Sequence, residues 1–114
     1  MRILINTDLR KEKLEEDAKN NRDAFIENNI EVFGASWQVR SQDRDNIRFA
    51  VETSRAMGDN APESIGWILA DNTVRQTTAA DLEMVMLAYA MRMSAIFANY
   101  TAWRAGNKSH PFTI

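Results

Sequence analysis

The stretch that decides the fold runs from Trp67 to Gly106 and reads WILADNTVRQTTAADLEMVMLAYAMRMSAIFANYTAWRAG. Its first part alternates in the manner of a strand up to Asp71 and Asn72, the residue types besides glycine that best tolerate left-handed backbone angles. A two-stranded hairpin is therefore expected there. Thr78 and Asp81 follow with the spacing of a capping box, which predicts that a long helix begins at this point.

Along this helix large apolar residues recur at intervals of four and three, the spacing that lets one helix lie along another. These seam residues are Leu82, Met86, Tyr89, Met93, Ile96, Tyr100 and Trp103. A flanking row widens the apolar surface and consists of Val85, Leu87, Met91 and Phe97. We expect much of the helix to be covered, in part by a second copy of the protein. The alternative, that the seam is simply the core of a monomer, is equally open.

The chain before Trp67 predicts the same kinds of element. Residues 2–6 fit a short edge strand or an ordered lead-in. Thr7 or Asp8 then caps a charged helix over residues 9–28. Residues 30–40 alternate around Gly34, which supplies the positive φ that a hairpin turn needs.

A second helix follows this first hairpin. Ser41 or Asp43 is its expected cap, and apolar residues recur at helical spacing up to Met57. Gly58 suits the left-handed position that ends many helices. The order helix, hairpin, helix, hairpin, long helix predicts an α+β fold whose central packing element is the long C-terminal helix.

The length of the chain fits one domain with a single core. We expect one α+β domain over residues 1–106 and a C-terminal tail over residues 107–114. The tail carries Phe112 and Ile114, which either dock on a neighbouring subunit or fray with the chain end.

Composition excludes several classes of site. The chain has no cysteine, which removes thiolate catalysis, disulfides and cysteine-based metal centres. The formal net charge is −2 with no basic block, so nucleic acid is not an expected partner. The sequence shows no residue that would orient the single histidine, His110, for catalysis. We therefore expect no enzyme, no catalytic residue, no metal and no cofactor.

The long helix also raises the question of a membrane. Between Met84 and Thr101 the only charge is Arg92, in the middle of the segment. A charge at a bilayer centre costs about 2.5–3.5 kcal/mol, so a buried protein interface is the better interpretation. Residues 2–6 are too short for the apolar region of a signal peptide, which favours the cytoplasm.

Three further groups have a functional and a structural interpretation. The carboxylates between Glu12 and Asp17 stand among lysines, as on a solvated helix face. Trp37 is more often a core anchor of a hairpin than a ligand platform. Residues 43–45 satisfy a helix terminus and pair locally, and Asp71 is a turn residue rather than a general base. We prefer the structural interpretation in each case.

A combined pattern in the chain resembles a known family. Its residues are Gly34, Trp37, Asp43, Arg44, Trp67, Asp71, Asn72, Thr77, Thr78 and Leu82, followed by a long helix with alanine and arginine. Over about residues 9 to 105 the chain looks like a small uncharacterised domain family of bacteriophage and prophage proteins, commonly in or beside tail-fibre genes. The resemblance implies phage origin and association with the tail or its fibre. It implies no catalytic residues, and it suggests a free-standing form of the domain.

Two functional hypotheses follow. In the first, the protein is an interaction module of a phage tail, either an assembly factor for the fibre or a small structural subunit, located in the virion tail or in the host cytoplasm during assembly. Its partners would be further copies of itself, as a dimer or trimer, and a tail or tail-fibre protein. In the second, it is a small phage-encoded regulator that binds and inhibits a host protein.

Overall fold

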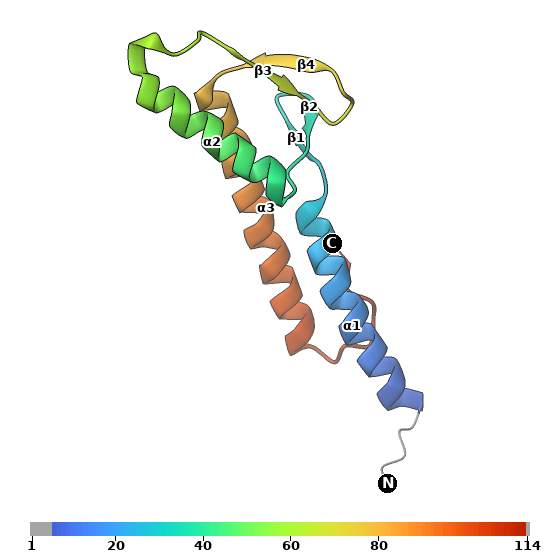
Figure 1. Ribbon diagram of the computed structural model, residues 1–114. Coiled ribbons are helices and arrows are strands. Elements are labelled where there is room, and N and C mark those ends of the chain that lie inside the picture. The colour runs from blue at the N-terminus through green and yellow to red at the C-terminus, as the bar shows by residue number, and fades with distance from the viewer. Residues whose placement is uncertain (1–5, 114) are drawn as a thin grey trace. The chain divides into compact units, whose positions relative to one another are not determined.

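The computed structural model describes residues 6–113, with side chains from Leu9 onward. The bounds of its elements are α1 Asn6–Glu27, β1 Ile30–Val32, β2 Ala35–Trp37, α2 Ser41–Met57, the 3-10 helix η1 Gly58–Asn60, β3 Ile65–Ile68, β4 Val74–Thr77 and α3 Ala79–Ala105 (Figure 1). The strands form two separate antiparallel sheets, β1–β2 and β3–β4. Three α-helices and two hairpins confirm the predicted α+β class.

The chain divides into two compact units. Unit 1 joins the N-terminal segment up to Ile26 to the segment from Arg92 onward, and unit 2 consists of Glu27–Met91. Helix α3 contributes its first half to unit 2 and its second half to unit 1. The single domain over residues 1–106 stays a prediction.

In unit 2 the first hairpin turns at Phe33 and Gly34, which have φ values of 57° and 70°. Positive φ at both central residues is the condition for the tight turn whose twist matches that of the paired strands. Trp37 pairs with Ile30 across the sheet and is fully buried. Its indole N–H donates a hydrogen bond of 2.9 Å to the carbonyl of Val32. Trp37 is therefore a core residue of the hairpin.

Helix α2 starts at Ser41, one residue earlier than a cap at Ser41 and three residues earlier than a cap at Asp43 would place it. Arg40 is the N-cap, and its backbone N–H donates to Oδ2 of Asp43 at 3.1 Å. Ser41 is thus the first helical residue rather than the cap, because the carboxylate of Asp43 already satisfies the terminus from inside the helix. At the other end Gly58 has φ 56°, and its N–H bonds back to the carbonyls of Ser54 and Arg55.

Of the charged residues at the start of α2, Asp45 pairs locally with Arg48, whereas Arg44 contacts residues outside the helix. A terminal N–H of Arg44 donates to the carbonyl of Val39 at 2.7 Å, and the guanidinium lies 3.4 Å from Glu27. It also covers the ring of Tyr89, 4.6 Å from the centroid. Arg44 thereby ties α2 to the first half of α3.

The second hairpin turns at Asp71 and Asn72. Oδ1 of Asp71 accepts hydrogen bonds from the backbone N–H and the hydroxyl of Thr73, at 3.0 and 2.6 Å. These bonds hold the pKa of Asp71 below its usual range. Asn72 has φ 67°. One backbone bond, from Ala70 N–H to the carbonyl of Ser36 at 3.0 Å, joins this hairpin to β2.

The first half of α3 packs within unit 2. The buried apolar residues of the unit are Ile30, Trp37, Val39, Ile47, Leu69, Leu82, Val85 and Tyr89. Arg75 of β4 extends this core, since its guanidinium lies 5.1 Å from the ring centroid of Phe33 and 5.7 Å from that of Trp37. It also lies 3.6 Å from Asp81 in the first turn of α3.

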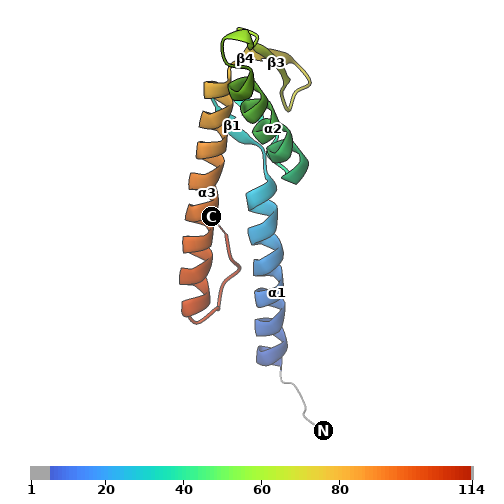
Figure 2. The same cartoon turned by 60° about the vertical axis from the view of Figure 1, so that its left-hand side comes forward.

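In unit 1, α1 and the second half of α3 lie side by side in both views (Figures 1 and 2). Helix α1 begins at Asn6, before the expected caps Thr7 and Asp8, and so includes both in its first turn. Most of the strand expected over residues 2–6 lies outside the described residues. On α1 the one fully buried apolar side chain among those described is Ala18.

The C-terminal tail completes the core of unit 1. Phe112 is only 2% exposed and clusters with Ala18 and Tyr100, with Phe25 and Trp103 packed around them. The indole N–H of Trp103 donates to the carbonyl of His110 at 2.8 Å. The tail therefore docks on its own chain, an outcome that was not among the two expected for it.

Candidate interaction surface

Most of the seam of α3 faces its own chain. In unit 2 Leu82 and Tyr89 are buried, and in unit 1 Ile96 and Tyr100 are buried. The other seam residues, Met86, Met93 and Trp103, are half-buried. This burial favours the interpretation of the seam as the core of each unit.

The other side of α3 remains uncovered by this chain. In unit 2, Met84, Leu87 and Met91 are 49%, 51% and 66% exposed. Their spacing of three and four residues places them on one side of the helix, and we call these three residues the α3 outer face. Val85 of the flanking row is fully buried, whereas Leu87 and Met91 belong to the exposed side.

The outer face carries no charge of its own. The nearest acidic residue, Glu83, forms an ion pair with Arg55 of α2. In unit 1, Arg92 donates from Nη2 to the carbonyl of Ile26 at 2.9 Å, which joins α3 to α1. The exposed fractions of the outer face correspond to roughly 300 Å² of apolar surface, the size of the largest patch on a typical monomer.

Phe97, the last residue of the flanking row, lies in unit 1 and is 43% exposed. The guanidinium of Arg22 on α1 lies 5.5 Å from its ring centroid and 4.8 Å from that of Tyr100. Arg22 therefore shields part of this ring, and Phe97 is less available to a partner than Met91.

The N-terminus of α3 is held by its own cap. The Thr78 hydroxyl accepts a hydrogen bond from Asp81 N–H at 3.1 Å, and Oδ2 of Asp81 accepts from Thr78 N–H at 3.2 Å. The Thr77 hydroxyl donates to the same carboxylate oxygen at 3.2 Å. Gly34, Asp71 and Asn72 thus set turns, and Thr78 and Asp81 set the start of α3.

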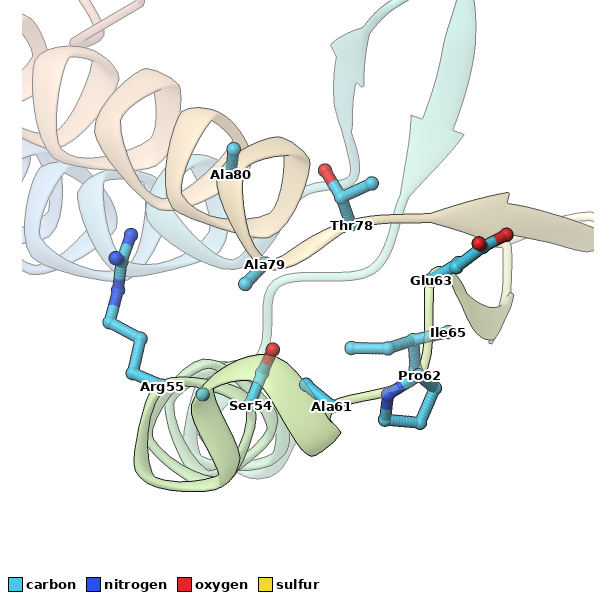
Figure 3. A pocket seen from close by; sticks show the side chains of 10 residues that line it. Ser54, Arg55, Ala61, Pro62, Glu63, Ile65, Thr78, Ala79 and Ala80 are labelled. Atoms are coloured by element: carbon cyan, nitrogen blue, oxygen red, sulfur yellow. The ribbon is translucent and has the colours of Figure 1, made fainter.

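A hollow of about 450 Å³ lies beside this terminus in unit 2. Figure 3 shows Arg55 and Glu63 at opposite ends of it, with Ala61, Pro62 and Ile65 between them. Arg55 is engaged with Glu83, and the Thr78 hydroxyl caps α3. The guanidinium of Arg55 and the hydroxyl of Thr78 therefore serve the fold.

Two further observations concern metals and membranes. Among residues 6–113, no group of three or more His, Asp or Glu side chains is placed to hold a metal ion. Within the same part of the chain, no helix is long and apolar enough to cross a membrane.

Comparison with known proteins gave one match. The model of a family described as Domain of unknown function (DUF4376) matches residues 8–109. Searches of curated proteins and of solved structures found no match. The matched segment includes both hairpins, α2, all of α3 and nearly all of α1. The chain belongs to the DUF4376 family, an uncharacterised domain family.

Proposed function

We propose that this protein is a non-enzymatic interaction module of a bacteriophage tail, which assembles through the α3 outer face. It acts in tail-fibre assembly or as a small structural subunit of the tail or fibre. The observation that carries the proposal is the exposure of Met84, Leu87 and Met91 on a helix whose opposite side is buried. Methionine side chains are flexible and polarizable, which suits an adaptable contact surface.

The occupant of the outer face that we propose is a second copy of this chain. Leu87 lies between Met84 and Met91, so two antiparallel outer faces place Leu87 against Leu87 and each Met84 against the Met91 of the other copy. Burying two such faces removes roughly 600 Å² from water, which is below the about 1,200 Å² of a standard interface. This pairing closes at two copies, so the assembly is a dimer that should depend on protein concentration.

The matched experiment compares two exposed apolar residues of unit 2. Leu87→Glu places a charge in the proposed interface. Burying that charge without an opposite charge is unfavourable in the assembly, whereas in the monomer the charge stays in water. Phe49→Glu makes the same kind of change on α2, where Phe49 is 72% exposed. We expect light scattering between about 10 μM and 1 mM to show the wild type and Phe49→Glu associating and Leu87→Glu monomeric. A monomeric wild type, or an unchanged Leu87→Glu, contradicts self-association through this face.

Association with the tail rests on the resemblance of the hairpin-to-helix segment to phage tail-fibre-associated domains. Mass spectrometry of purified phage particles and of fibre assembly intermediates tests it. Peptides of this chain in either sample support the proposal. If the chain is absent from both and co-purifies with a host protein early in infection, the regulator hypothesis replaces it.

A further inference from the structure

A second hollow in unit 2 lies along the edge of β3, opposite the start of α2. It has a volume of about 380 Å³. Its lining residues are Gln38, Asp43, Asn46, Gly66, Trp67 and Ile68. We call it the β3-edge hollow, and neither the caps of α3 nor its outer face contributes to it.

The backbone of β3 presents unpaired groups to this hollow. Leu69 N–H donates to the carbonyl of Thr73 at 2.8 Å, and residues along an antiparallel strand alternate between facing the partner strand and facing away. Leu69 faces the partner strand, and Gly66 and Ile68 lie an odd number of positions before it. Their N–H and C=O groups therefore point away from β4. Ala70 faces the same way as Gly66 and Ile68, and its N–H donates to the carbonyl of Ser36 of β2.

The segment after β2 also borders the hollow. Gln38 follows β2 and lines the hollow together with Gly66 and Ile68 of β3. Within the described residues no further backbone hydrogen bond joins these two segments. The hollow thus opens between these two chain segments, and we call this opening the fork.

The side chains around the fork also have unused hydrogen-bonding capacity. In the described part of the chain, neither the Gln38 amide nor the Trp67 indole N–H makes a hydrogen bond. Asp43 uses Oδ2 to accept from Arg40 N–H, which leaves Oδ1. Asn46 uses Oδ1 to accept from Gln42, which leaves its two amide N–H donors.

We propose that the β3-edge hollow binds one sugar residue of a neutral carbohydrate. Sugar hydroxyls donate and accept at once, which suits a site that combines a carboxylate, two amides, backbone N–H and C=O groups and an indole N–H. The half-buried ring of Trp67 offers an apolar surface for the C–H groups of a pyranose.

Other ligand classes fit less well. The carboxylate of Asp43 repels an anion such as a phosphate. An apolar ligand would leave the amides and the indole N–H without partners. An added peptide strand needs a longer free edge, since only two residues of β3, Gly66 and Ile68, turn their backbone groups toward the fork. The proposal goes beyond self-assembly and does not depend on it.

Nuclear magnetic resonance titration of the ¹⁵N-labelled full chain tests the site. The probes are glucose, galactose, N-acetylglucosamine and their short oligomers, each up to about 50 mM, since a single-residue site is expected to bind in the millimolar range. We expect at least one to give saturable shifts at the Trp67 indole N–H and at the amides of Gly66 and Ile68. Trp67→Phe identifies the indole signal among the three tryptophans.

Asn46→Ala and Gln38→Ala should each weaken the binding by up to about tenfold, the effect of losing one or two hydrogen bonds. Asn20→Ala is the matched control, because Asn20 is an exposed helical asparagine of unit 1. The absence of saturable shifts with all sugars, equal weakening by Asn20→Ala, or saturable binding of an extended peptide in place of sugars overturns the proposal. A chain that self-associates but binds no sugar overturns this inference alone.

Discussion

Replacing Phe112 by alanine removes the side chain that completes the core of unit 1. Its ring centroid lies 5.5 Å from that of Tyr100, 6.0 Å from that of Phe25 and 6.1 Å from that of Trp103. Burial of a phenylalanine contributes about 1.5–3 kcal/mol, and aromatic pairs add about 0.5–1.5 kcal/mol each. Because a chain end can move to close part of the cavity, we expect a loss near the lower limit for Phe→Ala, about 3 kcal/mol.

Urea unfolding followed by circular dichroism measures this loss, and the thermal midpoint should fall by roughly 12 °C. Phe49→Ala is the matched control, since it is the same substitution at a side chain that is 72% exposed. It should change the free energy of unfolding by less than about 0.5 kcal/mol. A loss below about 1 kcal/mol for Phe112→Ala refutes the tail as part of the core.

Three further substitutions test local features. Thr78→Ala removes the hydroxyl that accepts from Asp81 N–H, and calorimetry should show a loss of about 1 kcal/mol; no loss contradicts the cap. Gly34→Ala meets open space but imposes φ 70° on a residue with a Cβ, so urea unfolding should show a loss of about 1 kcal/mol, whereas a gain contradicts the turn. Because the pKa of Asp71 is lowered in the folded chain, its carboxylate stabilises the fold at pH values above the usual pKa of an aspartate. This contribution disappears as the pH falls through the lowered pKa. A carboxyl titration should find that pKa below 3.8, and Asp71→Asn should reduce the acid sensitivity of unfolding; an ordinary pKa contradicts the turn bonds to Thr73.

Much of the fold could be predicted from sequence because local chemistry sets it. Helical spacing of apolar residues, Gly34 and the Asp71–Asn72 pair are readable without knowledge of distant residues. The predicted start of α2 was wrong. A carboxylate inside the first turn can cap a helix as well as one before it, and Asp43 does so by accepting from the N–H of Arg40, which is the N-cap.

Tertiary features were harder to predict. The tail was expected to dock on another subunit or to fray, because no spacing rule links Phe112 to Ala18, far away in the sequence. The seam and its flanking row were both apolar, and periodicity alone does not show which side of α3 its own chain covers. The separation of Val85, which is buried, from Met91, which is exposed, became visible only in the structure.

These features support a division of roles along α3 in unit 2. One side holds the core, and the outer face is exposed. Of the seam residues, Leu82 and Tyr89 are buried in this core, whereas Met84, Leu87 and Met91 lie on the exposed side; the expected role of the seam in assembly stays a prediction.

The most direct test of this account is oxidative footprinting of the methionines at increasing protein concentration. Met84 and Met91 are 49% and 66% exposed, and Met57 on α2, at 44%, serves as the control of similar exposure. Oxidation rates follow solvent access. The account predicts that Met84 and Met91 become protected as the concentration rises while Met57 keeps its rate; unchanged rates at all three, or equal protection of all three, contradict assembly through the α3 outer face.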